Sequence, residues 1–315
     1  MDRRPLGKTG LEISPLVFGG NVFGWTIDEA TSHTLLDAFV DAGFNCIDTA
    51  DVYSKWKPGN RGGESETIIG NWLKRSGKRR QVVIATKVGY EMGPQSVGLW
   101  KKYILRAVED SLKRLQTEYI DLYQSHVDDK EVPLEETLNA YDKLIKQGKV
   151  RAIGASNYAG ERLEQALKVG AENRLPTYQT LQPLYNLYDR EPYESDLEPV
   201  CLKHGLGVIP YFSLGSGFLT GKYRSEDDLG DSARSARVKK YLNERGTRIL
   251  NALDTVALQV EATPAAVALA WLLARPSITA PIASSTNLNQ LTELIGATRL
   301  KLNSAQISIL NQHSA

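Results

Sequence analysis

Short apolar segments alternate with amphipathic segments along the chain, and this alternation constrains the fold more than any other feature. Segments of this kind are typical of strands that are buried on both faces. Eight such strands, each followed by a helix or a helix-bearing connection, predict a (β/α)8 barrel (a TIM barrel). A doubly wound open sheet is the alternative, but the even alternation and the lack of a domain-like linker favour one barrel domain over residues 1–315. The predicted strands cover residues 16–20, 44–48, 82–87, 120–126, 150–156, 178–182, 207–211 and 278–282.

The segments between these strands have helical patterns. The Ser/Thr-x-x-Glu form of residues 26–29 predicts a capping box, with the first helix beginning at Thr26. A small hairpin is predicted over residues 4–14, and the most polar loop is 222–237. Extra helices are expected after the seventh strand and at the C-terminus. A further helix is predicted to begin at Pro264, and two terminal helices close the chain. The other predicted helices cover residues 26–41, 64–75, 101–115, 133–147, 161–169, 197–204 and 239–260.

Charge and cysteine content narrow the class of protein. Lys and Arg number 38 and Asp and Glu 37, so the net charge of +1 favours neither nucleic acid nor an anionic membrane as a partner. The N-terminus has no apolar signal core, and no segment approaches the roughly 20 apolar residues of a membrane-spanning helix. The two cysteines lie in apolar segments, which favours free thiols in a reducing compartment. We therefore expect a soluble cytoplasmic protein.

Four titratable residues lie at or just beyond the ends of three neighbouring predicted strands. Asp48 ends the second strand, Lys87 the third and His126 the fourth, while Tyr53 lies on the loop after the second. In a barrel, the carboxyl ends of the strands face one side and hold the catalytic groups. Of the four histidines, only His126 ends a strand. Each residue alone has a structural explanation, but together they predict an active site.

The chemistry of these four groups suits addition of hydride to an aldehyde or ketone. A lysine ammonium beside the phenol is expected to lower the pKa of Tyr53, and Asp48 is expected to keep Lys87 charged and in place. Tyr53 could then donate a proton to the carbonyl oxygen, which His126 orients. Metal-dependent hydrolysis is not expected, because no set of His, Cys, Asp and Glu has strong ligand spacing, and no metal is predicted.

The ordered motifs of the chain resemble the aldo-keto reductase superfamily, in the branch that includes bacterial reductases and potassium-channel β subunits. The resemblance implies a catalytic tetrad of Asp48, Tyr53, Lys87 and His126, with Tyr53 as general acid, and a nicotinamide cofactor bound without a Rossmann motif. The glycine-rich residues 215–221 have a final spacing one residue too long for that motif and follow a late strand. The motifs are residues 48–53, 63–66, 86–87, 121–126, 154–157, 182–186 and 214–217.

The same resemblance implies the residues that bind the cofactor. Tyr211 would stack on the nicotinamide ring, although a core aromatic is the alternative from the residue alone. Many relatives have an arginine where this chain has Asn287, so NADPH is expected as the cofactor while NADH stays possible. Ser156, Asn157 and Gln182 would hold the carboxamide, Phe212, Leu214, Ser216, Gly217, Leu219 and Lys222 the pyrophosphate, and Ser284, Thr286 and Gln290 the adenosine phosphate.

The sequence says less about the substrate, which is expected to be a small carbonyl compound. Trp25, Trp56 and Trp100 fall on loops at the predicted catalytic face and could rim an apolar pocket, although they could equally anchor those loops. Two other functions stay open, namely a cofactor-binding regulatory subunit that senses redox state and an unrelated barrel isomerase or lyase. The physiological substrate, the pathway and the oligomeric state do not follow from the sequence.

Overall fold

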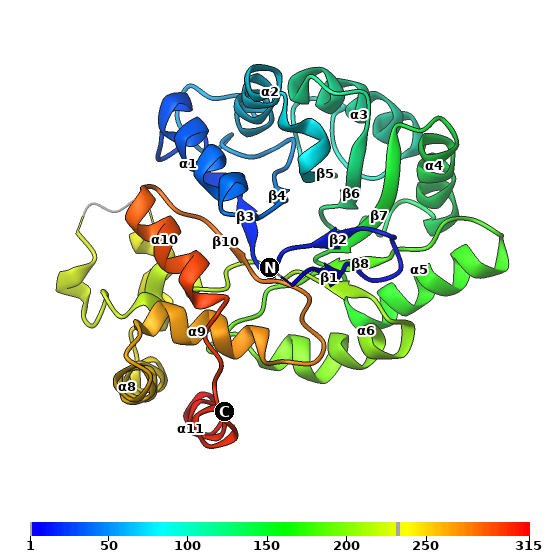
Figure 1. Cartoon of the computed structure of the whole chain (residues 1–315). Helices are drawn as coiled ribbons and strands as arrows, with labels where there is room; N and C mark the ends of the chain where they lie inside the picture. The colour runs from blue at the N-terminus through cyan, green and yellow to red at the C-terminus, as the bar shows by residue number, and fades with distance from the viewer. Residues whose placement is uncertain (1, 231–233) are drawn as a thin grey trace.

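The computed structural model describes residues 2–230 and 234–315, and its strands form one curved sheet with helices around it (Figure 1). Eight parallel strands lie in the order β10-β3-β4-β5-β6-β7-β8-β9. They are short and almost wholly buried, as expected for strands covered on both faces. The strands are β3 (Val17–Gly19), β4 (Cys46–Asp48), β5 (Val83–Val88), β6 (Ile120–Ser125), β7 (Val150–Ser156), β8 (Thr180–Gln182), β9 (Gly207–Val208) and β10 (Ile282–Ala283).

The first and last strands of this order meet, so the sheet closes into a barrel. On one side β10 pairs with β3, where Ile282 lies opposite Val17. On the other side a parallel bridge joins Val208 of β9 to Ile278, and the Ile282 amide donates to the Pro210 carbonyl at 2.9 Å. A doubly wound open sheet would leave these two edges apart. The predicted (β/α)8 barrel is therefore confirmed.

Helices form the outer ring of the barrel (Figure 1). In α3, for example, Ile104, Val108, Leu112 and Leu115 recur at helical spacing and are all buried, so one face of the helix packs inward. The ring consists of α1 (Glu29–Asp41), α2 (Glu64–Ser76), α3 (Lys101–Leu115), α4 (Leu134–Lys146), α5 (Gly160–Glu172), α6 (Glu198–His204), α9 (Pro264–Leu273) and α10 (Leu288–Ala297), and the additional helices are α7 (Ser235–Val238), α8 (Glu244–Gln259) and α11 (Ser304–Ser314).

An antiparallel hairpin of β1 (Arg4–Pro5) and β2 (Glu12–Ile13) precedes the barrel, as predicted. The side chains of Leu6, Leu11 and Ile13 belong to the same buried cluster as the inward-facing side chains of the barrel strands. The hairpin therefore covers one end of the barrel, and the opposite end is left for loops.

Side chains along each strand alternate between the inside and the outside of the barrel. In β5, Val83 and Ala85 belong to the inner cluster, whereas Ile84 belongs to the outer cluster that packs beneath the helices. Because the alternation has a period of two, the next inward position of β5 is Lys87. A charged side chain thus enters the barrel interior at the end opposite the hairpin.

The last two strands differ from the predicted ranges 207–211 and 278–282. β9 ends at its second residue and β10 begins only where the predicted strand ends. The cause is a proline in each segment, Pro210 and Pro281, because proline has no amide to donate to the ladder.

Two helix starts also differ from prediction. The first helix is capped by Asp28, whose side chain accepts from the Thr31 amide at 2.8 Å, so the predicted capping box at Thr26 is wrong. The long helix predicted over 239–260 begins only at α8, because Asn243 caps it by accepting from the Gly246 amide at 2.9 Å. Residues 231–233 of the predicted polar loop 222–237 lie outside the described residues.

Within residues 2–230 and 234–315, no single helix is both long enough and apolar enough to cross a membrane. Over the same residues, α8 and α9 taken together are long and apolar enough, but they are bent by 92° at the break between them, and they qualify by length and composition alone.

Candidate active site

Five polar side chains meet at the end of the barrel opposite the hairpin. Asp48, Ser156 and Gln182 end β4, β7 and β8. Lys87 lies one residue before the end of β5, and His126 directly follows β6. All five occupy inward positions of the alternating pattern, so the barrel directs them toward one another.

Asp48 is the centre of a buried hydrogen-bond network. Its Oδ2 accepts from Lys87 Nζ at 2.8 Å and from Tyr53 Oη at 3.1 Å. Its Oδ1 accepts from Gln182 Nε2 at 2.8 Å. The residue is only 1% exposed, and these bonds offset the cost of removing the carboxylate from water. Asp48 thus has the cationic partner that the sequence required.

Lys87 uses each of its three ammonium protons within this network. Besides Asp48, Nζ donates to the Thr49 carbonyl and to Tyr53 Oη, both at 2.8 Å. Complete burial lowers the pKa of Lys87, and the negative charge of Asp48 opposes that effect. The lysine is therefore fixed in position and joined directly to the phenol.

The protonation of Tyr53 differs from the prediction. Burial, reinforced by the charge of Asp48, raises the pKa of Tyr53 well above its usual value, whereas Lys87 was expected to lower it. The prediction was based on the Lys87 cation alone. The Asp48 carboxylate, however, accepts a hydrogen bond from the same phenol and disfavours its ionised form. Tyr53 therefore keeps its proton until an acceptor reaches it.

His126 is held as a neutral ring beside Tyr53. Burial and the nearby charge of Lys87 lower the pKa of His126 well below its usual value. Its ring packs edge-on against Tyr53, with centroids 5.9 Å apart, and against Tyr90 at 4.5 Å. A neutral imidazole can donate one hydrogen bond without adding charge to the site.

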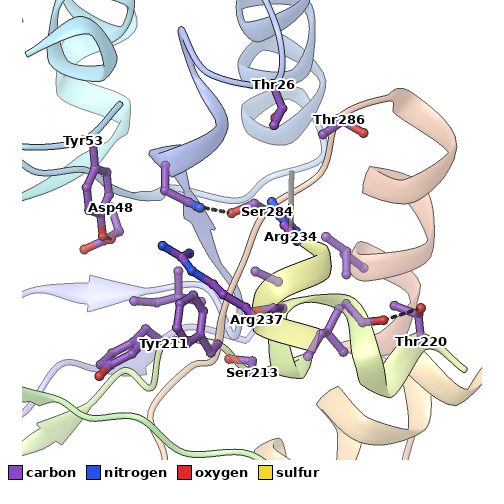
Figure 2. A pocket seen from close by; sticks show the side chains of 18 of the residues that line it. Thr26, Asp48, Tyr53, Tyr211, Ser213, Thr220, Arg234, Arg237, Ser284 and Thr286 are labelled. Carbon is purple, nitrogen blue, oxygen red and sulfur yellow. Dashed lines mark hydrogen bonds between the residues drawn. The ribbon is translucent and has the colours of Figure 1, made fainter. Parts of the chain in front are cut away.

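A cavity of about 1100 Å³ opens above this network. Tyr53 and Asp48 lie on one side of it and Thr220 and Thr286 on the other (Figure 2). The volume is at the upper end of the range for small-molecule sites, which suits a large ligand together with a small one. Of the predicted site residues, its lining includes Asp48, Tyr53, Trp56, His126, Ser156, Asn157, Gln182, Tyr211, Phe212, Leu214, Ser216, Gly217, Lys222, Ser284, Thr286 and Gln290.

Four other predicted residues lie outside the cavity lining. Lys87 is fully buried behind the phenol and the carboxylate that it contacts. Leu219 is fully buried and belongs to the outer hydrophobic cluster. Trp100 is 46% exposed at the start of α3, so its predicted pocket role is not supported. Trp25 contacts two residues of the lining, Trp56, with ring centroids 5.5 Å apart, and Arg234, whose guanidinium lies 5.8 Å from the Trp25 ring.

The loop after β7 is linked to both sides of the cavity. Asn157 has a left-handed backbone with φ 56°, and its Nδ2 donates to the His126 carbonyl at 2.8 Å. Its Oδ1 accepts from Tyr211 Oη at 2.7 Å. These bonds hold the amide of Asn157 and the ring of Tyr211 against the cavity, where both could contact a planar ligand.

The glycine-rich segment 215–220 forms a tight turn along the cavity wall. Ser216 and Gly217 both have left-handed backbones, with φ 58° and φ 100°, and both line the cavity. Successive amides in such turns form concave sites for anions. Lys222 and Ser284 lie in the same lining, so these residues fit the phosphates of a dinucleotide cofactor.

Sequence reasoning missed two arginines of the cavity, Arg234 and Arg237. Both line the cavity and come from the polar loop after the glycine-rich turn, and Figure 2 shows them near Ser284 and Tyr211. The Arg237 guanidinium lies 5.6 Å from the centroid of the Phe212 ring. No local pattern marks these residues in the sequence, since the loop simply appears charged and polar.

The chain is thus a closed parallel barrel whose mouth combines this network with a large cavity. The chain belongs to the aldo/keto reductase family, whose model matches residues 15–315. An uncharacterized oxidoreductase, YrpG, of Bacillus subtilis is 36% identical, and the match covers 99% of this chain and 95% of that protein.

Two further relatives carry more specific names. A probable voltage-gated potassium channel subunit beta of rice is 34% identical over 93% of this chain and 90% of its own length. The fission-yeast aldo-keto reductase yakc [NADP(+)] is 31% identical over 98% of this chain and 91% of its own length. The family, together with the names of the bacterial and fission-yeast relatives, supports an oxidoreductase that uses a nicotinamide cofactor.

Proposed function

We propose that this protein reduces aldehydes and ketones to alcohols with NADPH, and that Tyr53 is the general acid. The observation that carries the proposal is the direct contact of Tyr53 Oη with Lys87 Nζ and Asp48 at the floor of a large cavity. We also propose that the whole chain acts as one barrel domain, because the site draws on strands from both halves of the sequence.

The protein groups have separate roles in this reaction. When bound, a reduced nicotinamide supplies a hydride to the carbonyl carbon. Tyr53 donates its proton to the carbonyl oxygen, and the Lys87 ammonium at 2.8 Å stabilises the phenolate that remains. The neutral His126 ring donates a hydrogen bond to the same oxygen and orients the carbonyl. Asp48 holds Lys87 in place.

Residues on the wall beside this network would position the nicotinamide. The ring of Tyr211 would cover one face of it, and Ser156, Asn157 and Gln182 would hold its carboxamide. The fixed contacts of Asn157 with Tyr211 and with the His126 carbonyl support this arrangement.

The cations that line the cavity support a cofactor with an additional phosphate, as in NADPH. Lys222, Arg234 and Arg237 line the cavity, together with Ser284 and other polar residues of the adenosine segment. Guanidinium groups bind phosphate strongly, so the arginines could replace the one that many relatives have at the position of Asn287. The name of the yeast relative, with NADP(+) in it, agrees with NADPH.

A second candidate function is a cofactor-binding subunit that senses redox state with little turnover. The relatives named as potassium channel subunits favour it. The hydrogen bonds among Asp48, Lys87 and Tyr53 favour catalysis, because a binding subunit has no need for a buried proton donor at the cavity floor.

Tyr53→Phe tests the proposal. Removing the phenolic hydroxyl takes away the proton donor but keeps the ring, so kcat should fall by at least about a hundredfold. Oxidation of NADPH in the presence of a panel of aldehydes, followed by absorbance, measures this loss. Cofactor affinity, measured by quenching of protein fluorescence, should change by less than about threefold.

The wild-type protein separates the two candidate functions in the same assay. Cofactor binding without oxidation by any aldehyde would favour the sensing subunit. Full turnover by the phenylalanine variant would show that another group serves as acid, and clearly tighter binding of NADH than of NADPH would reverse the cofactor assignment.

A further inference from the structure

Lys55 lies at the reaction end of the cavity, on the loop that also holds Tyr53. Its Nζ donates to the backbone carbonyl of Glu91 at 2.5 Å. Glu91 directly follows Tyr90, whose ring packs against His126 at 4.5 Å, and all of these residues line the cavity. The lysine therefore stands close to where a substrate carbonyl would meet the tetrad.

The ammonium of Lys55 has donors to spare. It carries three protons, and its hydrogen bond to the Glu91 carbonyl uses one of them. Over residues 2–230 and 234–315, no carboxylate lies within 4.0 Å of its Nζ. The other lysine and arginine residues of the cavity lining are Lys222, Arg234 and Arg237. The guanidinium of Arg234 lies 5.8 Å from the centroid of the Trp25 ring, and that of Arg237 lies 5.6 Å from the Phe212 ring.

The walls around Lys55 are aromatic. The ring of Trp56 lies 5.9 Å from that of Tyr53 and 5.5 Å from that of Trp25. A cation beside an apolar wall attracts an anion more strongly than the same cation in water. The carboxylate of Glu91 also borders this space, but the residue is exposed to solvent, where its repulsion of another anion is screened.

We propose that Lys55 binds a carboxylate on the substrate, so that the preferred substrates are aldehydes and ketones with an aromatic or apolar body and a carboxylate at the far end. This inference rests on the proposed reductase function and adds the substrate class to it. Trp56 and Tyr90 contact the body, while Lys55 pairs with the carboxylate.

A matched pair of aldehydes tests the proposal. We would measure kcat/KM with NADPH for 4-carboxybenzaldehyde and for its neutral methyl ester, which share the ring and the aldehyde. The wild-type ratio of acid to ester should exceed one and should fall with added salt. In Lys55→Met the ratio should drop about tenfold, whereas Lys55→Arg, which keeps the charge, should stay within about threefold of the wild type.

Lys57 provides the control. It is exposed on the same loop and lies outside the cavity lining, so Lys57→Met should leave the ratio unchanged. An equal ratio in the wild type and Lys55→Met would overturn the inference, as would an equal loss for both aldehydes, which would mean that Lys55 only braces the loop at Glu91.

A binding measurement keeps the inference testable without turnover. Quenching of tryptophan fluorescence by 4-(hydroxymethyl)benzoate and by its methyl ester should show tighter binding of the anion in the wild type, and this preference should be lost in Lys55→Met. If neither aldehyde is reduced, the proposed function fails, and this titration alone then decides whether Lys55 binds the carboxylate. Equal binding of both compounds would overturn it.

Discussion

The carboxyl group of Asp51 is buried close behind the tetrad, on the outer side of the barrel wall. The Asp51 amide donates to the Lys87 carbonyl at 3.3 Å, but among the described residues neither carboxyl oxygen of Asp51 has a hydrogen-bond partner. Nearby, Glu66 is paired with Arg114 at 2.7 Å and accepts from Thr86 at 2.6 Å. Burial first, and then the charge of Glu66, raise the pKa of Asp51 well above its usual value. Burial therefore favours the protonated form of Asp51 in the folded protein.

Asp51→Asn should stabilise the protein, and the gain should depend on pH. The unfolded chain releases the Asp51 proton near pH 4, whereas the folded state keeps it to higher pH. The folded state then binds more protons, so stability falls as pH rises through this window. The asparagine variant lacks this loss and should be more stable by about 1 kcal/mol at pH 7, with less difference at pH 4. Urea unfolding at both pH values measures it.

Two further variants give the contrast. Glu66→Gln should lower stability by about 2 kcal/mol, because it leaves the partly buried guanidinium of Arg114 without its carboxylate partner. Asp227→Asn, at an exposed position, should change stability by less than about 0.5 kcal/mol at either pH. A pH-independent effect of Asp51→Asn would mean that Asp51 is ionised in the folded state.

At the scale of elements, the predicted and observed structures agree best where a pattern is local. α3 and β7 have the predicted bounds, because the apolar spacing of each is uninterrupted. Agreement fails where two local signals compete, as with the helix caps at Thr26 and Asp28, or where a proline cuts a strand. No sequence pattern predicted a role for Arg234 and Arg237, because their role depends on which wall of the cavity their segment covers.

Loss of one of these arginines should weaken NADPH binding more than NADH binding. Arg234→Gln and Arg237→Gln each remove a guanidinium from the cavity, and at least one should raise the Kd for NADPH about tenfold while changing that for NADH by less than threefold. Fluorescence titrations with both cofactors measure the two constants. Lys239→Gln is the control, because Lys239 lies outside the lining and pairs with Glu226 at 2.9 Å on the surface. Parallel losses for both cofactors in both arginine variants would assign the arginines to the shared pyrophosphate.

At the scale of the whole molecule, the cavity joins parts of the barrel that are far apart in the sequence. Its lining runs from the strand ends near Asp48 through the loop at Tyr211 to Ser284 and to Gln290 in the first turn of α10. A ligand that fills it contacts both halves of the chain. Binding should therefore stabilise the entire barrel and not one loop alone.

Saturating NADPH should raise the melting temperature of the protein. At a ligand concentration of 100 times Kd, binding adds about 2.7 kcal/mol of stability, which corresponds to roughly 4 °C for a chain of this size. Calorimetric scans with NADPH, and with inorganic phosphate at the same concentration as a control, measure the shift. An unchanged melting temperature would contradict the assignment of the cavity to the cofactor.

The order of strands and helices, and the placement of Asp48, Lys87 and His126 at the ends of neighbouring strands, followed from the sequence by itself. Apolar periodicity acts between near neighbours, so it is already present in the linear chain. Only the tertiary structure decided that Gln182, 134 residues away, also bonds Asp48, that Tyr53 keeps its proton, and that two loop arginines face the cavity. Burial and Coulomb energies depend on distances through space, which no local pattern specifies.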